Sequence, residues 1–167
     1  MNRLLDKITP RTRVFLAIVG FVVVADQITK YLVRHLIPLY KSTVVIPGFF
    51  NLTHIHNPGG AFGFLAHNSA PWRHWLFLFA AIVALGMILY FYHRTPNTHF
   101  ALGLGLALIF GGAVGNLIDR LRYGEVIDFL DFYILHLHWP TFNVADSAVT
   151  IGVGIFILHI IFKKMPF

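Results

Sequence analysis

The sequence contains no cysteine, which excludes a disulfide framework, a thiol nucleophile and a thiolate metal site. Serine is also scarce: only Ser42, Ser69 and Ser147 occur, and none lies in a GxSxG motif, so a serine nucleophile is poorly supported. No phosphate-binding loop is present, and the ten histidines form neither an HExxH motif nor a recognisable haem pair. The sequence therefore suggests no metal ion and no organic cofactor.

Charged residues are few as well, at 12% of 167 residues, whereas hydrophobic residues make up 57% and the mean hydropathy is +0.71. This apolar content exceeds what the core of a soluble globular protein requires. The apolar residues come in long unbroken runs, without the alternation of a transmembrane barrel. We therefore predict an all-α membrane protein that forms a single integral membrane domain over residues 1–167.

Four apolar runs approach the length of about 20 residues that a helix needs to cross a hydrocarbon core about 30 Å thick. The basic and then apolar N-terminal stretch continues past Ala25 without a small-residue cleavage site, so we interpret it as an uncleaved first span. Residues 44–56 are rich in β-branched and aromatic residues, which predicts a small strand or hairpin at the membrane surface. The predicted spans are about 14–33, 72–92, 100–118 and 143–162, with long outer connectors at about 34–71 and 119–142.

Basic residues are divided unevenly between the two sides of this predicted domain. Four spans put both termini on one side, where seven basic residues stand against one acid, Asp6; seven minus one is +6, the whole formal charge of the chain. The opposite side sums to zero, so the positive-inside rule predicts cytoplasmic termini and long connectors on the outer face. The basic charge thus reports topology and does not indicate a nucleic-acid partner. The seven residues are Arg3, Lys7, Arg11, Arg13, Arg94, Lys163 and Lys164.

Two acids, Asp128 and Asp146, stand at the border between the second outer connector and the last predicted span. A charge near the bilayer centre costs roughly 2.5 to 3.5 kcal/mol, so acids beside a span usually face the protein interior and have a function. Asp146 could instead belong to a helix-capping box that begins at Asn143 and is worth about 1 kcal/mol, but a cap alone would not need Asp128. Two carboxylates in contact share one proton, and the positive end of the helix dipole favours Asp146 as the ionised member.

Other charged residues lie near span ends. Asp26 and Lys30 are four positions apart and share a helix face, so they form either a buried structural ion pair or the border of a polar site. Asp119 and Arg120 follow the third span and can pair with the connector or with Lys30, and we favour a structural role for both.

Glycine-rich and histidine-containing motifs occur nearby. Gly111 and Gly115 form a small-xxx-small arrangement that lets a neighbouring helix approach. The loop HNPGGAFG at 56–63 is either an ordinary tight turn or a cover over a bound peptide. The pairs His54/His56 and His136/His138, each spaced by two, are interpreted as interfacial polar residues.

Taken together and in this order, DQITK, NPGGAFG, GGAVGNLIDRLRYGEVIDF and FNVADS closely resemble the boxes of the bacterial lipoprotein signal peptidase (signal peptidase II) family, over nearly the whole chain. In that family the catalytic dyad is formed by the aspartates of the VxDF and FNxAD boxes, which match Asp128 and Asp146. The segment with His136 and His138 matches nothing that we can assign. Family residues that line or support the site match Asp26, Lys30, Asn57, Gly59, Asn116, Asp119, Arg120 and Asn143.

This resemblance implies an aspartic endopeptidase of the bacterial inner membrane that removes the signal peptide from prolipoproteins, just before a cysteine carrying diacylglycerol. Its partners would be the lipid-modified prolipoprotein and membrane lipids, with no nucleic acid, metal or cofactor. The two aspartates would activate a water and polarise the scissile carbonyl, and the connector at 41–70 is our candidate for a platform or lid. The alternatives are a proton-coupled transporter, whose acids should be spread across the membrane, and an assembly factor that uses its glycine-lined helices.

Overall fold

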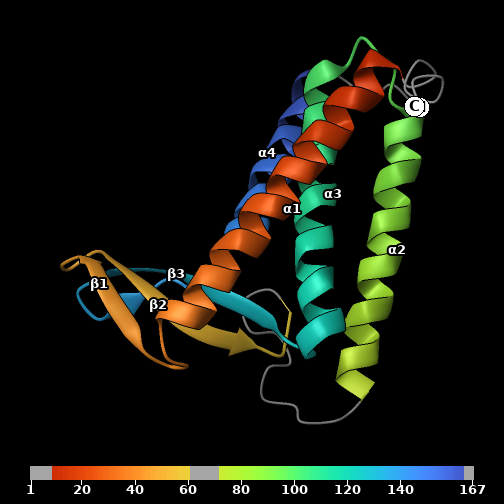
Figure 1. Cartoon of the computed structure of the whole chain (residues 1–167). Helices are drawn as coiled ribbons and strands as arrows, with labels where there is room; N and C mark the ends of the chain where they lie inside the picture. Colours follow the sequence, from red (N-terminus) through yellow and green to blue (C-terminus); the bar gives the residue numbers. More distant parts are fainter. Residues whose placement is uncertain (1–8, 61–71, 164–167) are drawn as a thin grey trace.

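The computed structural model describes residues 9–60 and 72–163, and long helices dominate it (Figure 1). Four of these helices are long and apolar enough to cross a membrane, and a small antiparallel sheet lies at one end of them. The predicted class, a helical membrane protein with a small β-containing region, is confirmed. The helices are α1 (Pro10–Leu36), α2 (Trp72–Arg94), α3 (Phe100–Tyr123) and α4 (Val144–Lys163).

Two helix ends differ most from the predicted spans. The first helix begins earlier, at Pro10, because the preceding Thr9 accepts a hydrogen bond from the Thr12 N–H at 3.2 Å and proline suits the first helical position. The third helix continues beyond residue 118 and ends at Tyr123, where Gly124, with a left-handed φ of 77°, is the C-cap. Hydropathy ends the third span at its first charges, but Asp119 pairs with Lys30 and Arg120 donates to the Gly59 carbonyl, and the helix continues.

The sheet contains strands from both outer connectors. Its strands are β1 (Ser42–Ile46), β2 (Phe50–Asn57), β3 (Val126–Ile134) and β4 (Leu137–His138), antiparallel and in that order. The first two confirm the predicted hairpin, whereas β3 and β4 were not predicted. Five of the first six residues of β3 are buried, so the strand lacks the alternating pattern that identifies a half-exposed strand.

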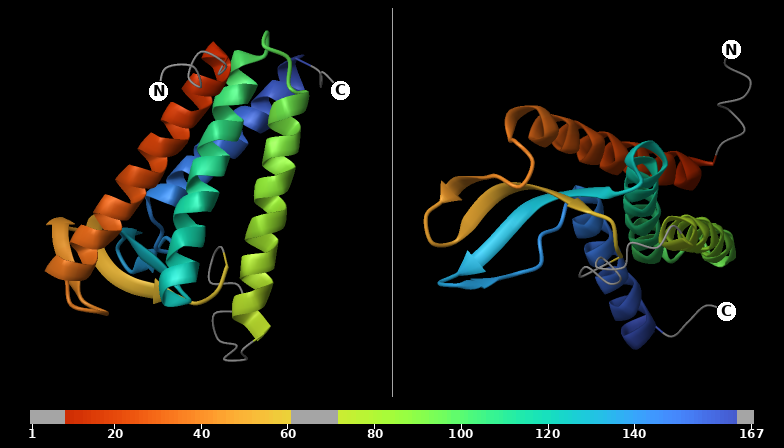
Figure 2. Two further views of the ribbon diagram at one scale, coloured as in Figure 1. Left: turned by 45° about the vertical axis from the view of Figure 1, so that its right-hand side comes forward. Right: turned by 90° about the horizontal axis from the view of Figure 1, so that it is seen from below.

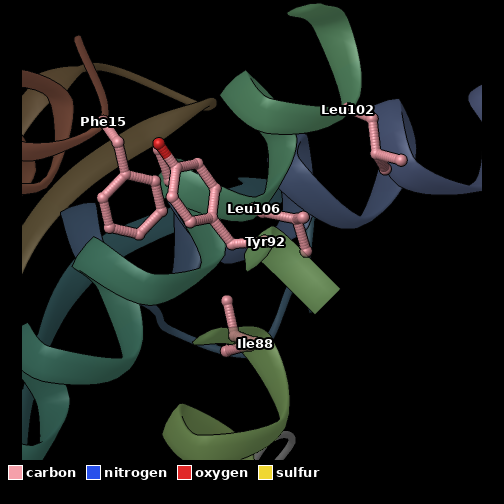
Figure 3. Packing of buried hydrophobic residues seen from close by; sticks show 6 residues of the cluster. Phe15, Ile88, Tyr92, Leu102 and Leu106 are labelled. Carbon is pink, nitrogen blue, oxygen red and sulfur yellow. The ribbon is translucent and has the colours of Figure 1, made fainter. Parts of the chain in front are cut away.

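The helix α3 is the centre of the bundle and packs against α1, α2 and α4. Figure 3 shows the apolar cluster near the start of α1, where the Tyr92 ring lies against Phe15 with a centroid distance of 4.2 Å. A second cluster joins Val33 and Ile37 to Phe129 of β3, and thereby fixes the sheet to the end of α1. The sheet thus lies at the end of the bundle opposite to the start of α1 and the end of α4 (Figures 1 and 2).

Small residues let α1 approach α3 closely, as the sequence predicted. A Cβ atom added to Gly111 would lie 3.0 Å from Cβ of Val22, and one added to Gly115 would lie 2.6 Å from Oδ2 of Asp26. Distances this short leave no room for a side chain. The two glycines therefore bring the Asp26 carboxylate directly against α3.

Candidate active site

Asp128 on β3 and Asp146 in the first turn of α4 line the same cavity, which has a volume of about 430 Å³. This volume lies within the range of about 300 to 1,000 Å³ that is typical of ligand pockets. The cavity lies where the sheet meets the end of α3 and the start of α4. Its other lining residues are Asn57, Gly60, Asn116, Arg120, Val126, Trp139, Pro140, Thr141, Phe142, Val149 and Thr150.

A backbone bridge brings the two aspartates together. The Leu130 N–H donates to the Phe142 carbonyl at 2.8 Å, and the Phe142 N–H donates back to the Leu130 carbonyl at 3.2 Å. Because Phe142 directly precedes the cap of α4, this bridge holds the first turn of α4 beside the strand that carries Asp128. Residues eighteen positions apart in the sequence, 146 minus 128, thereby share one cavity.

Asn143 caps α4 and confirms the predicted capping box. The Asp146 N–H donates to Asn143 Oδ1 at 2.9 Å, and the Asn143 N–H donates to Asp146 Oδ2 at 3.2 Å. The side-chain amide of Asn143 also donates from Nδ2 to Asp128 Oδ1 at 2.8 Å and to the Ile127 carbonyl at 3.2 Å. One side chain therefore links the helix cap to both aspartates.

Asp128 is 3% exposed, and both of its oxygens accept hydrogen bonds. The second donor is Asn57, whose Nδ2 lies 2.9 Å from Asp128 Oδ2. Burial, and after it the negative charge of Asp146, raises the pKa of Asp128 from its ordinary value of 3.8 to about 7. The amide donors and the positive charge of Lys30 oppose this rise. At neutral pH, Asp128 is therefore poised between its protonated and ionised forms.

A buried lysine lies behind Asp146. Asn116 donates from Nδ2 to Asp146 Oδ1 at 2.8 Å, and its Oδ1 accepts from Lys30 Nζ at 2.9 Å. Lys30 Nζ also lies 2.8 Å from Asp26 Oδ2 and 2.8 Å from Asp119 Oδ2, so all three ammonium donors have acceptors. These contacts confirm both ion pairs predicted for Lys30, and all three charged side chains are at most 2% exposed.

The two buried carboxylates also fix the elements that carry the dyad. Asp26 Oδ1 accepts from the Ala145 N–H at 3.0 Å, in the first turn of α4, and Asp119 Oδ2 accepts from the Ile127 N–H at 3.2 Å, next to Asp128. Gln27, which was not among the predicted site residues, donates to Asp119 Oδ1 at 2.9 Å. Its position inside the DQITK box was the available indication.

Arg120 and Asn57 hold the turn that closes one side of the cavity. Arg120 Nη2 donates to the Gly59 carbonyl at 3.0 Å, and the Gly59 N–H donates to Asn57 Oδ1 at 2.9 Å. The glycine loop at 56–63 is thus a tight turn in its first part. Its remainder, and residues 61–70 of the connector predicted as a platform or lid, lie outside the described residues.

The wall of the cavity formed by residues 139–142 was not predicted, although this stretch adjoins the FNVADS box. The histidines serve as polar contacts: His54 Nδ1 lies 2.8 Å from the Ile37 carbonyl oxygen, and His56 Nδ1 lies 3.3 Å from Glu125 Oε2. Within residues 9–60 and 72–163, no group of three or more metal-ligating side chains could hold a metal ion. The described side chains at the site therefore offer carboxylates, amides and cations.

Two carboxylates that line one cavity can divide one proton between an acid and a base, which suits the activation of a water. The family model for signal peptidase (SPase) II matches residues 18–162. Lipoprotein signal peptidases from Desulforapulum autotrophicum and Geobacter sulfurreducens are 55% and 46% identical, over 93% and 91% of this chain and 97% and 94% of theirs. A solved bacterial membrane enzyme is 34% identical, with a TM-score of 0.81 over 91% of this chain and 94% of its own. The chain therefore belongs to the signal peptidase II family.

Proposed function

We propose that this chain is an aspartic endopeptidase that removes the signal peptide from diacylglyceryl-modified prolipoproteins, cutting just before the lipidated cysteine. The observation that carries the catalytic type is that Asp128 and Asp146 line one cavity and are both bound by Asn143. The relatives are named lipoprotein signal peptidases, which supports the substrate class.

The surroundings of the two aspartates assign them different roles. Asp146 lies in the first turn of α4, and its two oxygens accept hydrogen bonds from the Asn116 amide and the Asn143 N–H, so no protein acceptor is needed to bind a proton of Asp146. Asp128 is buried and has a pKa raised to about 7, which favours its protonated form. In the free enzyme, Asp146 is thus the general base and Asp128 the general acid.

The reaction then needs only water as a second reactant. Asp146 takes a proton from the water as its oxygen bonds to the scissile carbonyl carbon, while Asp128 donates its proton to the carbonyl oxygen. The tetrahedral intermediate collapses when Asp128 takes back a proton from one hydroxyl and Asp146 donates its proton to the leaving nitrogen. The carbon–nitrogen bond breaks, which releases the signal peptide and the new amino terminus of the lipidated cysteine.

The buried residues around the dyad are proposed to keep it in place. Lys30 offsets the charges of Asp26 and Asp119, and these carboxylates accept backbone N–H groups of α4 and β3. Arg120 lies at the same cavity and holds the turn at Gly59. Asp26 and Lys30 therefore act as a structural pair that also borders the polar site.

We infer that the protein lies in the bacterial inner membrane with both termini in the cytoplasm and the cavity at the outer face. The start of α1 and the end of α4 lie at the end of the bundle opposite to the sheet (Figure 1). The terminal side carries the excess of basic residues in the sequence. The acids of the site cluster at one end of the bundle, whereas the acids of a proton-coupled transporter should be spread along it. In this orientation the signal helix and the acyl chains stay in lipid, and the whole chain acts as one membrane domain.

The test is cleavage of a lipid-modified prolipoprotein by the purified full-length protein. We expect Asp128→Asn and Asp146→Asn each to lose cleavage while remaining folded, because each removes one of the two proton-transferring groups. Glu125→Gln is the matched control, since it removes an acid from the same end of the molecule but not from the cavity. Near-normal cleavage by either aspartate variant would contradict the dyad.

A further inference from the structure

The hairpin of β3 and β4 carries two histidines, His136 and His138, that the proposed mechanism does not use. Their surroundings differ: His138 Nδ1 lies 2.7 Å from Asp131 Oδ1, whereas His136 is exposed at the turn. An ionised carboxylate only accepts hydrogen bonds, so the His138 tautomer that carries its hydrogen on Nδ1 donates to Asp131. The side chain of Asp131 is 8% exposed, so this hydrogen bond ends on a buried carboxylate.

Asp131 is held from the other side by β2. Asn51 Nδ2 donates to Asp131 Oδ2 at 3.0 Å, and the two residues face each other in the register of β2 and β3. The His138 ring also stacks on Tyr133, with centroids 4.9 Å apart and planes at 10°. His138 thus attaches the short strand β4 to β3 through one hydrogen bond and one ring contact, and Asp131 links the hydrogen bond onward to Asn51 of β2.

The residue after His138 begins the wall of the cavity. The Trp139 N–H donates to the Phe132 carbonyl at 2.8 Å, and Phe142 pairs with Leu130 at the far end of the wall. All four residues from 139 to 142 line the cavity that contains the two aspartates. Backbone hydrogen bonds therefore attach the wall to β3 at both of its ends. His138 directly precedes the first of these attachment points.

We propose that His138 is a positioning residue that acts through Asp131 to hold the 139–142 wall in place, and thereby sets the affinity for the part of the substrate that fills the cavity. This inference rests on the proposed function. His138 is not among the residues that line the cavity, so its effect must pass through the wall. A wall that contacts non-reacting groups binds the ground state and the transition state alike, so its loss raises KM and leaves kcat nearly unchanged.

The experiment measures kcat and KM of the full-length protein in lipid nanodiscs with a diacylglyceryl-modified prolipoprotein. We expect His138→Ala to raise KM about three- to tenfold with kcat within about twofold, since the lost hydrogen bond ends on a charged group but is partly exposed. His138→Asn should restore a KM near the wild-type value, because its amide nitrogen can donate from about the position of Nδ1. His136→Ala is the matched control and should behave as wild type.

A purely structural role predicts a different pattern. If His138 only stabilised the fold, His138→Ala would lower the amount of active enzyme and hence the apparent kcat, with KM unchanged, and that result would overturn the inference. The inference would also be overturned if His138→Asn raised KM as much as His138→Ala does. If the Ala variant does not fold, His138→Gln takes its place, because its donor lies farther along the side chain and should again raise KM.

A double-mutant cycle with Trp139→Ala tests whether His138 acts on substrate affinity through the 139–142 wall. Once the Trp139 side chain is removed, His138→Ala should raise KM much less than it does in the wild type. Fully additive effects would exclude the wall as the route. Absence of cleavage by the wild-type protein would refute the proposed function, whereas wild-type cleavage with an unaffected His138→Ala variant would refute only this inference.

Discussion

The folding stability of Asp128→Asn minus that of the wild type should rise with pH, even though the substitution removes a proposed catalytic group. The carboxyl of Asp128 is buried, and its pKa is raised from 3.8 to about 7 in the folded protein. Between these two values the unfolded chain has lost the proton and the folded protein still holds it. Folding stability of the wild type therefore falls with rising pH, by about 1.4 kcal/mol per pH unit.

The magnitude follows from the two pKa values. The difference of 7 minus 3.8 is about 3 pH units, so the wild type loses on the order of 4 kcal/mol in total, all of it between about pH 4 and pH 7. Below about pH 4 the group contributes nothing, and above about pH 7 the loss is complete. The asparagine side chain of the variant does not titrate, so the stability of Asp128→Asn minus that of wild type should rise across this window and then level off.

The assay is equilibrium unfolding of both proteins in the same detergent at intervals between about pH 4 and pH 8. An asparagine cannot accept both amide donors of Asp128, so the variant can start below the wild type at the acidic end of this range. The test is the slope with pH of the stability difference between the variant and the wild type. A constant offset between the two proteins does not change this slope. Glu125→Gln supplies the baseline for removing an acid at the same end of the molecule. A flat or falling difference would show that Asp128 is not held in its protonated form.

Two further substitutions test the buried supports of the site. Lys30→Met should lower the free energy of unfolding by about 3 to 5 kcal/mol, because it leaves two buried carboxylates without their cation. Lys41→Met, at an exposed position, is the control. Equal unfolding midpoints for the two variants would contradict the role assigned to Lys30. Gly112→Ala should reduce both stability and cleavage, because the added Cβ would lie 2.3 Å from the Ala145 carbonyl oxygen. Gly20→Ala is the control, since its added Cβ meets no atom within 4 Å. Similar melting curves for both variants would refute the close contact between α3 and α4.

The sequence predicted the parts of the site that depend on local spacing. The four spans follow from hydropathy alone, the Asp26–Lys30 pair from the helical repeat, and the capping box from the spacing of Asn143 and Asp146. Each of these features involves residues within one helix, where about 3.6 residues per turn determine which side chains meet.

The features that the sequence did not predict depend on contacts between distant segments. The strand β3 is buried on most of its length, so its apolar residues do not alternate and could not be distinguished from a connector. The amide of Asn143 reaches Asp128 only because Phe142 pairs with Leu130, and no local pattern reports that pairing. For the same reason the wall at 139–142 became visible only in three dimensions.

The hydrogen bond from the Ala145 N–H to Asp26 joins the first helix to the last, across 119 positions of the chain. The site is therefore completed only when the last helix has been synthesised. The segment at the start of α4 supplies Asp146, its capping residue Asn143 and the Ala145 N–H that binds Asp26. A chain that ends before α4 holds Asp128 but lacks Asp146. Under the proposed mechanism, such a chain lacks the group that activates the water, so α4 is the last element that the site requires.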